Sequence, residues 1–314
     1  MAHSFEYLLE KLDSAEIADD PFPHVYIEDF IAPDDFAALI DSPDIKVAPA
    51  HDLDSLFANL DTAGYKPIEF PGCTKSRTEY AEWLQKSVKP KGIHDACEGM
   101  GMAMRCTKPA SDIVRSLDEF FSSPVTRRVL SDKFGIDAPT TLDCGLQKYL
   151  NGYEISPHPD IRQKALTWML NVNPGADSEQ QDIHTHYMKF TGEWDFIRQF
   201  WRDNPNAETC WVPWQWCETS KRQVANNSIV IFAPRYDTVH AVRARYDHLP
   251  AQRTQFYGNL WYRPVALPFR PRFTDFAAGK APELDTVEKA SRADRLVSAA
   301  TRAVTKVIDW APAR

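Results

Sequence analysis

The chain has 314 residues, of which 43% are hydrophobic and 25% are charged, a composition typical of a globular protein with a buried core and not of a disordered one. Its formal net charge is −8, so it offers no general basic surface for a phosphate backbone, and nucleic-acid binding is disfavoured. The first 20 residues are acidic and amphipathic, unlike an export signal, and no segment is apolar over the length of a membrane span. No membrane partner is therefore expected.

Residues 1–140 are expected to form a mainly helical scaffold that packs on a core further along the chain. A strand-like run at 24–27 is followed by a helix that begins at Pro33, because an early proline, acids in the first turn and apolar residues at helical spacing are typical of a helix start. Residues 43–76 show no clear period. Three more helices are expected, at 77–87, 111–121 and 125–134.

From about residue 141 the sequence changes to short β-rich runs separated by turn residues. Such a succession is typical of a β-sandwich or barrel, so residues 141–265 are expected to form a mainly β core. The runs are 144–150, 165–172, 227–233 and 254–262.

Between the second and third runs lies the segment 174–226, which we interpret as a long insertion with a helical piece at 194–202. Its many tryptophans are expected either to pack the insertion onto the core or to form a lid over a ligand, since long inserts beside a rigid core often carry specificity. They are Trp194, Trp201, Trp211, Trp214 and Trp216.

The last part of the chain, 266–314, is expected to be an extension with an amphipathic helix at 284–310. Val297, Ala300 and Val304 fall on one apolar stripe of this helix. The stripe is expected either to pack against its own domain or to form a homodimer contact. The three parts together are interpreted as one integrated domain.

Six cysteines are scattered through the chain without a C-x-x-C pair. A disulfide framework and a zinc ribbon are therefore both unsupported, and we expect reduced thiols in a cytoplasmic protein. The cysteines are Cys73, Cys97, Cys106, Cys144, Cys210 and Cys217.

The most informative segment is 151–160, which ends in His158-Pro159-Asp160. A histidine and an acid two residues apart face the same side in an extended strand, because side chains there alternate with a period of two. Such a pair can bind one metal ion. With a second imidazole it forms the two-histidine, one-carboxylate set that leaves open positions on Fe(II). Nine histidines make a chance match easy, so the motif needs support from other elements.

The second imidazole is expected from His240, which follows the apolar run at 227–233 and begins the next extended piece. By spacing alone, His184, His186 or His248 fits the third ligand position equally well. His184 and His186 are also candidates to face a substrate, with a solvated loop position as the simpler interpretation.

Arg253 opens the last β-rich run. Alternation places Arg253, Gln255, Tyr257 and Asn259 on one polar-leaning strand face. A polar strand face is typical of a strand that lines a site, and a guanidinium can hold a carboxylate at two points. Arg253 is therefore a candidate for binding a carboxylate.

The order of these elements resembles the 2-oxoglutarate- and Fe(II)-dependent oxygenases, in the prolyl-hydroxylase-like branch. The similar segments span 21–40 and 144–262, about half of the chain. They are Pro21 to Val25 through Leu39, Tyr149-x-x-Gly152 with His158-Pro159-Asp160, Lys164 to Thr167 with Asn173-Pro174, and Asn227 to His240 with Arg253.

This resemblance implies an α+β fold with a mainly β core, a double-stranded β-helix (a cupin-like jelly roll) flanked by N-terminal helices and a C-terminal helix. It implies His158, Asp160 and His240 as catalytic ligands of Fe(II), and Arg253 as the anchor of the distal carboxylate of 2-oxoglutarate. Three further residues are suggested for the cofactor pocket. They are Tyr149, Thr167 and Asn171.

The resemblance further implies that O2 and 2-oxoglutarate are consumed, that succinate and CO2 are released, and that a C–H bond of the substrate is hydroxylated or desaturated. The presence of Asp160 argues against halogenation, which in this superfamily needs the carboxylate position free for halide. The segment after the second motif, 180–187, departs from the short Gly-Gly turn common in relatives, and this departure falls on the substrate side of the pocket.

The substrate expected first is a small metabolite, a sugar or a natural-product intermediate. One alternative is a peptidyl or prolyl-type protein hydroxylase, which an open groove would favour over an enclosed cavity. Alternatives of other classes are a non-catalytic cupin-like binding or sensor protein, and a metal enzyme that does not use 2-oxoglutarate and so does not need Arg253.

Overall fold

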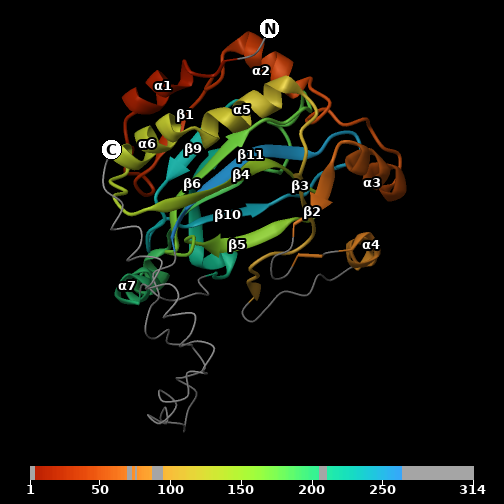
Figure 1. The fold of residues 1–314 in the computed structure, drawn as a ribbon. Helices are drawn as coiled ribbons and strands as arrows, with labels where there is room; N and C mark the ends of the chain where they lie inside the picture. Colours follow the sequence, from red (N-terminus) through yellow and green to blue (C-terminus); the bar gives the residue numbers. More distant parts are fainter. Residues whose placement is uncertain (1–3, 69–72, 75, 87–94, 205–210, 264–314) are drawn as a thin grey trace, which may run out of the picture. The chain divides into compact units, whose positions relative to one another are not determined.

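The computed structural model describes residues 4–68, 73–74, 76–86, 95–204 and 211–263 (Figure 1). Every helix and strand described lies within the unit Met1–Ala266. The amphipathic helix expected at 284–310, and the dimer contact expected through it, lie outside the described residues.

Within the described residues, the helices expected from the sequence are present with small shifts at their ends. The region 43–76 contains a helix that periodicity did not reveal. Its start is marked by Asp52, whose side chain accepts from the backbone N–H of Ser55 in a capping box. In the described residues no helix is long and apolar enough to cross a membrane. The α-helices are α1 (Leu8–Ser14), α2 (Pro33–Ile40), α3 (Leu53–Thr62), α4 (Arg77–Gln85), α5 (Asp112–Ser122), α6 (Pro124–Lys133) and α7 (Phe196–Asp203).

The larger of two antiparallel sheets has seven strands. Three of them come from the first 140 residues, so this mainly helical part of the chain also extends the sheet with three short strands. In spatial order the strands are β1 (Val25–Ile27), β9 (Ile229–Phe232), β6 (Lys164–Asn171), β11 (Arg253–Tyr262), β4 (Thr140–Tyr149), β3 (Ala103–Cys106) and β2 (Tyr65–Pro67).

The smaller sheet has four strands, β5 (Glu154–His158), β10 (His240–Arg243), β7 (Thr185–Phe190) and β8 (Cys217–Gln223), in that order. Strands β7 and β8 lie within 174–226, so the two flanks of this segment belong to the sheet and only the part between them is inserted. That part holds α7 and two 3₁₀ turns, η2 (Gly192–Trp194) and η3 (Trp214–Trp216). Because β8 is polar along most of its length, its sequence shows no strand-like apolar alternation.

Helices cover the outer face of the seven-stranded sheet, where α1, α2, α5 and α6 lie over β9, β6, β11 and β4 (Figure 1). At the centre of this layer, Trp168 of β6 is fully buried and stacks on Phe121 of α5 at 5.3 Å between ring centroids. Its indole lies over Gly258 of β11, where an added Cβ would come within 2.1 Å of the ring. Gly258 is therefore required for this close packing.

Candidate metal centre

A pocket of about 490 Å³ lies between the two sheets. The seven-stranded sheet contributes one wall through β4, β6 and β11, and the four-stranded sheet contributes the other through β5, β7 and β10. The four polar-leaning residues of β11 all line it, as alternation predicted. They are Arg253, Gln255, Tyr257 and Asn259.

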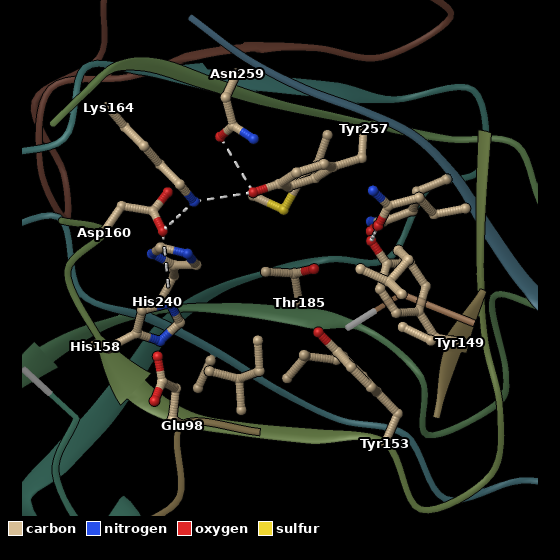
Figure 2. Close-up of a pocket in the computed structure, with 18 of the residues that line it drawn as sticks. Glu98, Tyr149, Tyr153, His158, Asp160, Lys164, Thr185, His240, Tyr257 and Asn259 are labelled. Atoms are coloured by element: carbon tan, nitrogen blue, oxygen red, sulfur yellow. Dashed lines mark hydrogen bonds and ion pairs between the residues drawn. The ribbon is translucent and has the colours of Figure 1, made fainter. Parts of the chain in front are cut away.

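Three of the predicted residues converge at one side of this pocket. One ligand atom each from His158, Asp160 and His240 lies within 4.8 Å of the others, and Figure 2 shows the three side chains grouped together. His158 ends β5 and His240 begins β10, directly opposite it in the antiparallel register. Asp160 lies two residues beyond β5, because Pro159 interrupts the strand.

The alternative histidines lie elsewhere. His184 is hydrogen-bonded to the Glu179 carbonyl at 3.3 Å and His186 to the Thr219 hydroxyl at 2.9 Å. His248 is buried with its ring edge-on to Tyr80. Among the described residues, the histidines that join Asp160 in a possible metal cluster are His158 and His240.

Each of these two histidines is oriented by its own backbone. The Nδ1 of His158 lies 2.8 Å from the carbonyl oxygen of Ser156, and the Nδ1 of His240 lies 2.9 Å from that of Thr238. Because a carbonyl oxygen only accepts, Nδ1 carries the hydrogen and Nε2 keeps a free lone pair.

Both imidazoles are neutral in this environment. Burial, together with the neighbouring His240, lowers the pKa of His158 to about 3, and burial lowers the pKa of His240. Neutral imidazoles with exposed Nε2 lone pairs are the form that binds a metal ion.

Asp160 is held as a carboxylate although it is only 6% exposed. Burial opposes its charge, but the positive charge of Lys164 outweighs burial, so the pKa of Asp160 lies below its usual range. Lys164 Nζ lies 2.7 Å from Oδ1, and the Thr167 hydroxyl donates to Oδ2 at 2.6 Å. Lys164 also donates to the Tyr257 hydroxyl at 3.1 Å (Figure 2).

Sequence reasoning did not identify the part played by Lys164. The available signal was its position four residues after Asp160. Outside a helix, residues at this spacing are not expected to be in contact. The contact depends on the turn after Pro159, which the sequence did not predict. Thr167, which was expected in the cofactor pocket, instead contacts the Asp160 carboxylate and is not among the residues that line the pocket.

Arg253 is 4% exposed. Its Nη2 donates to the Thr185 hydroxyl at 3.0 Å, and its guanidinium carbon lies 4.5 Å from the centroid of the Tyr149 ring. Tyr149 lies across the pocket from Asp160 (Figure 2). Among the described residues no carboxylate forms an ion pair with Arg253, and burial lowers its pKa, so a buried cation is available to an anionic ligand.

Asn171 lies within the wall and not at the surface of the pocket. Its Oδ1 accepts from Gln255 Nε2 at 2.9 Å, and its Nδ2 donates to the backbone carbonyls of Gln223 and Ala225, both at 3.2 Å. These bonds join β6, β8 and β11, so Asn171 is engaged in holding the two sheets together and is not among the residues that line the pocket.

Most tryptophans of 174–226 pack against protein. Trp194 stacks on Trp216 with ring centroids 4.0 Å apart, and Trp201 packs against Phe190 of β7. Trp214 Nε1 donates to Glu154 Oε1 at 2.8 Å. Packing therefore describes these residues better than a lid.

Trp211 is different, because it lines the pocket. The residue after it, Val212, donates its backbone N–H to the Pro157 carbonyl at 2.8 Å, next to His158. This bond fixes the backbone beside Trp211 against the end of β5. Of the five tryptophans in 174–226, Trp211 is the one among the pocket's lining residues.

Comparisons with known proteins found no matching family model and no matching curated protein. Solved structures do resemble the chain. They include a prolyl hydroxylase from Trichoplax adhaerens in complex with a hypoxia-inducible-factor peptide fragment (11% identity, 81% of this chain and 86% of that chain covered, TM-score 0.39). A prolyl-4-hydroxylase from Pseudomonas putida matches with 10% identity, 82% and 98% coverage, and a TM-score of 0.39.

A third solved structure is the non-haem α-ketoglutarate-dependent epimerase SnoN from nogalamycin biosynthesis, with 14% identity, 88% of this chain and 92% of that chain covered, and a TM-score of 0.37. The names of these three proteins, two prolyl hydroxylases and an α-ketoglutarate-dependent epimerase, agree with the resemblance noted in the sequence. Because the identities and TM-scores are this low, the functional proposal rests on the geometry of the pocket.

Proposed function

We propose that this protein is an Fe(II)- and 2-oxoglutarate-dependent oxygenase that oxidises a C–H bond of a small molecule. The observation that carries the proposal is one pocket that holds two different binding elements. His158, Asp160 and His240 converge at one side of it, with both Nε2 atoms free. Across the pocket, the buried Arg253 has no carboxylate partner among the described residues.

The donor atoms fit Fe(II). Two neutral imidazoles and one carboxylate form the facial set found in non-haem iron oxygenases, and such a set leaves coordination positions open for other ligands. The hydrogen bonds from Nδ1 to backbone carbonyls fix both rings, and Lys164 with Thr167 fixes the carboxylate. Bound there, Fe(II) with O2 would supply the oxidising chemistry, coupled to decarboxylation of 2-oxoglutarate to succinate and CO2.

Arg253 and Tyr149 are suited to the co-substrate. A guanidinium binds a carboxylate through two parallel hydrogen bonds, and burial strengthens such bonds. When the amide of Gln147 is oriented to satisfy both of its neighbours, it donates to the Tyr149 hydroxyl at 2.7 Å and accepts from Arg105 at 2.6 Å. The hydroxyl hydrogen of Tyr149 then remains available to a carboxylate held by Arg253.

The two sheets are proposed to be the halves of a double-stranded β-helix. In support, the pocket lies between two antiparallel sheets, and the three strands β5, β10 and β11 bring the proposed histidine ligands and anchor to it. In this arrangement the ligands come from the smaller sheet and its exit turn, while the co-substrate anchor comes from the larger one.

A small molecule is proposed as the substrate in preference to a peptide. The pocket is about 490 Å³, a volume typical of small-ligand sites. Trp211 and Ile68 contribute apolar surface to its lining, and such surface favours a compact ligand. The proposed cofactors are Fe(II), 2-oxoglutarate and O2.

The test is succinate formation by anaerobically purified full-length protein supplied with Fe(II), 2-oxoglutarate and then O2. We expect metal-dependent succinate formation that falls at least about a hundredfold in Asp160→Ala, because loss of a ligand costs more than the 10–100-fold effect typical of residues that only support a ligand. The matched control is Asp132→Ala, an exposed position of α6, which should behave as wild type.

Binding of 2-oxoglutarate by calorimetry, with and without Zn(II), provides a second measurement that does not need turnover. Metal-dependent binding is expected in wild type and should be lost in Asp160→Ala. Equal succinate formation by Asp160→Ala and wild type, or wild type that neither forms succinate nor binds 2-oxoglutarate, would contradict the proposal and favour a sensor protein or a metal enzyme of another kind.

A further inference from the structure

Glu98 lines the pocket on the same side as the histidine and aspartate cluster, and in Figure 2 it lies next to His158. The segment that carries it is fixed along the free edge of β5. The backbone N–H of Cys97 donates to the Ser156 hydroxyl at 2.9 Å, and the N–H of Ser156 donates to the Cys97 carbonyl at 3.1 Å. Glu98 is therefore presented by a backbone that is itself hydrogen-bonded to the sheet.

The backbone that follows Glu98 is also hydrogen-bonded to β5. Met100 and Glu154 form an isolated antiparallel bridge, with N···O distances of 2.8 and 3.2 Å between their backbones. Because the chain is held both before and after Glu98, the position of its backbone, and so the part of the pocket that its carboxylate can reach, is set by the fold and not by a long loop.

The other charged groups of the lining have interaction partners in the described structure. Arg105 is paired with Asp143 at 2.5 Å, and Lys164 with Asp160 at 2.7 Å. Arg253 donates to Thr185 and faces the Tyr149 ring. No hydrogen bond or ion pair to the Glu98 carboxylate is found among the described residues, although it is partly buried and burial raises its pKa.

A partly buried carboxylate without a partner is unfavourable, because it loses water without gaining a compensating charge or hydrogen bond. Such groups are found where a ligand supplies the missing partner. We propose that the substrate of this protein carries a protonated amine, and that Glu98 binds this ammonium group while the adjacent C–H bond faces the metal centre. The inference rests on the proposed function for the identity of the reacting site.

The surroundings favour an ammonium group over a hydroxyl group. A hydroxyl donates a hydrogen bond but leaves the negative charge of Glu98 uncompensated, whereas an ammonium supplies both the donor and the opposite charge. Trp211 also lines this pocket, and an indole face attracts a cation. With Glu98 beside His158, the amine would be bound close to the carbon that is oxidised.

The experiment compares two probes of similar size, cyclohexylammonium and cyclohexanol, by saturation-transfer NMR on the full-length protein. Each is titrated with Zn(II) and 2-oxoglutarate present and again with both omitted. Zn(II) is diamagnetic and supports no oxygen chemistry, so binding is read without turnover. The variants are Glu98→Gln, Glu98→Asp and Glu218→Gln, the last an exposed glutamate of β8 on the same sheet.

Wild type and Glu218→Gln are expected to bind the ammonium about tenfold or more tightly than the alcohol, since a charge-assisted bond contributes roughly 1.5–3 kcal/mol and 1.4 kcal/mol is tenfold. Glu98→Gln should remove the preference, and Glu98→Asp should retain part of it. Circular dichroism establishes that each variant is folded.

Three results would overturn the inference. In the first, wild type binds the ammonium no better than the alcohol, or binds neither. In the second, Glu98→Gln keeps the full preference for the ammonium. In the third, Glu218→Gln loses that preference. Loss of alcohol binding in Glu98→Gln, with no ammonium preference in wild type, would replace the amine by a hydroxylated ligand. An ammonium preference that depends on Glu98 without Zn(II) or 2-oxoglutarate would support the inference even if metal-dependent succinate formation fails, so the two failures are distinguishable.

Discussion

The two walls of the pocket differ in what lies behind them. The wall formed by β4, β6 and β11 is backed by helices, with Trp168 and Phe121 stacked in a fully buried layer. The wall formed by β5, β7 and β10 is backed by a small cluster around Trp201 and Val212 and by partly exposed tryptophans. Yet the second wall carries both histidines of the cluster, and Glu98 lies along its edge.

This contrast separates two requirements of one site. The helix-covered wall, formed by β4, β6 and β11, contributes Arg253 and Tyr149, whose proposed ligand is a co-substrate common to a whole class of enzymes. The other wall contributes the residues proposed to bind the metal and the substrate, which varies among such enzymes. Stability and co-substrate binding are therefore expected to depend on the first wall, and substrate choice on the second.

The largest expected effect is on stability. Trp168→Ala should lower the free energy of unfolding by about 3–5 kcal/mol, the usual cost of removing a large aromatic side chain from a tight core. The matched change on the other wall is Trp194→Ala, which breaks a stacked but partly exposed pair and should cost about 1 kcal/mol. Urea denaturation measures both, and equal losses would show that the walls do not differ in this respect.

The next effect concerns the co-substrate. Arg253→Met should weaken 2-oxoglutarate binding roughly thirtyfold, since charge-assisted hydrogen bonds contribute about 2 kcal/mol. Without ligand, the same change should not lower the free energy of unfolding, because a buried guanidinium that lacks a carboxylate partner is costly to desolvate. Calorimetry and urea denaturation test the two statements. Unchanged co-substrate affinity would remove Arg253 from the proposed site.

The smallest expected effect is on the pH dependence of stability, and it concerns the outer face of the helix-covered wall. Lys148 of β4 is fully buried, and its Nζ donates to the Ile45 carbonyl at 2.7 Å and to the Thr254 hydroxyl at 2.9 Å. Burial lowers the pKa of Lys148 to about 7. Between that pH and the usual lysine value of about 10.4, the unfolded chain binds a proton that the folded chain does not, so the contribution of Lys148 to stability rises with pH.

Lys148→Met removes this dependence. Between pH 8 and 9, wild type should gain about 1.4 kcal/mol relative to the variant, the value of one proton over one pH unit. Urea denaturation at the two pH values measures the change, and comparison with the variant cancels the titration of all other groups. A constant difference between the two proteins would mean that Lys148 stays charged in the fold.

Much of the site was predictable because it depends on local patterns. Alternation alone placed Arg253, Gln255, Tyr257 and Asn259 on the pocket face of β11, since a period of two is a property of any strand. The proline and acids at Pro33 likewise marked the start of α2. The choice of His240 among several histidines depended on the resemblance to a family and not on spacing.

The rest depended on contacts that no local pattern encodes. Strand β8 is polar and pairs with β7 across the inserted segment, so its membership in the sheet follows from its partner and not from its own sequence. Glu98 lies in a stretch without a motif and reaches the pocket through its pairing with β5. The ion pair of Lys164 with Asp160 requires the turn after Pro159.

That ion pair also affects how the site acquires its metal. Without a metal, the negative charge of Asp160 is balanced by Lys164, and both imidazoles are neutral. The ligand set itself therefore offers an approaching cation little net attraction, and electrostatic steering by these three residues contributes little to its capture. Selection among divalent ions must then come from the two Nε2 lone pairs, which favour borderline transition metals over Mg²⁺ and Ca²⁺. The site is thus expected to bind a transition-metal ion in preference to Mg²⁺ or Ca²⁺ because of its nitrogen ligands, even where Mg²⁺ and Ca²⁺ are far more abundant.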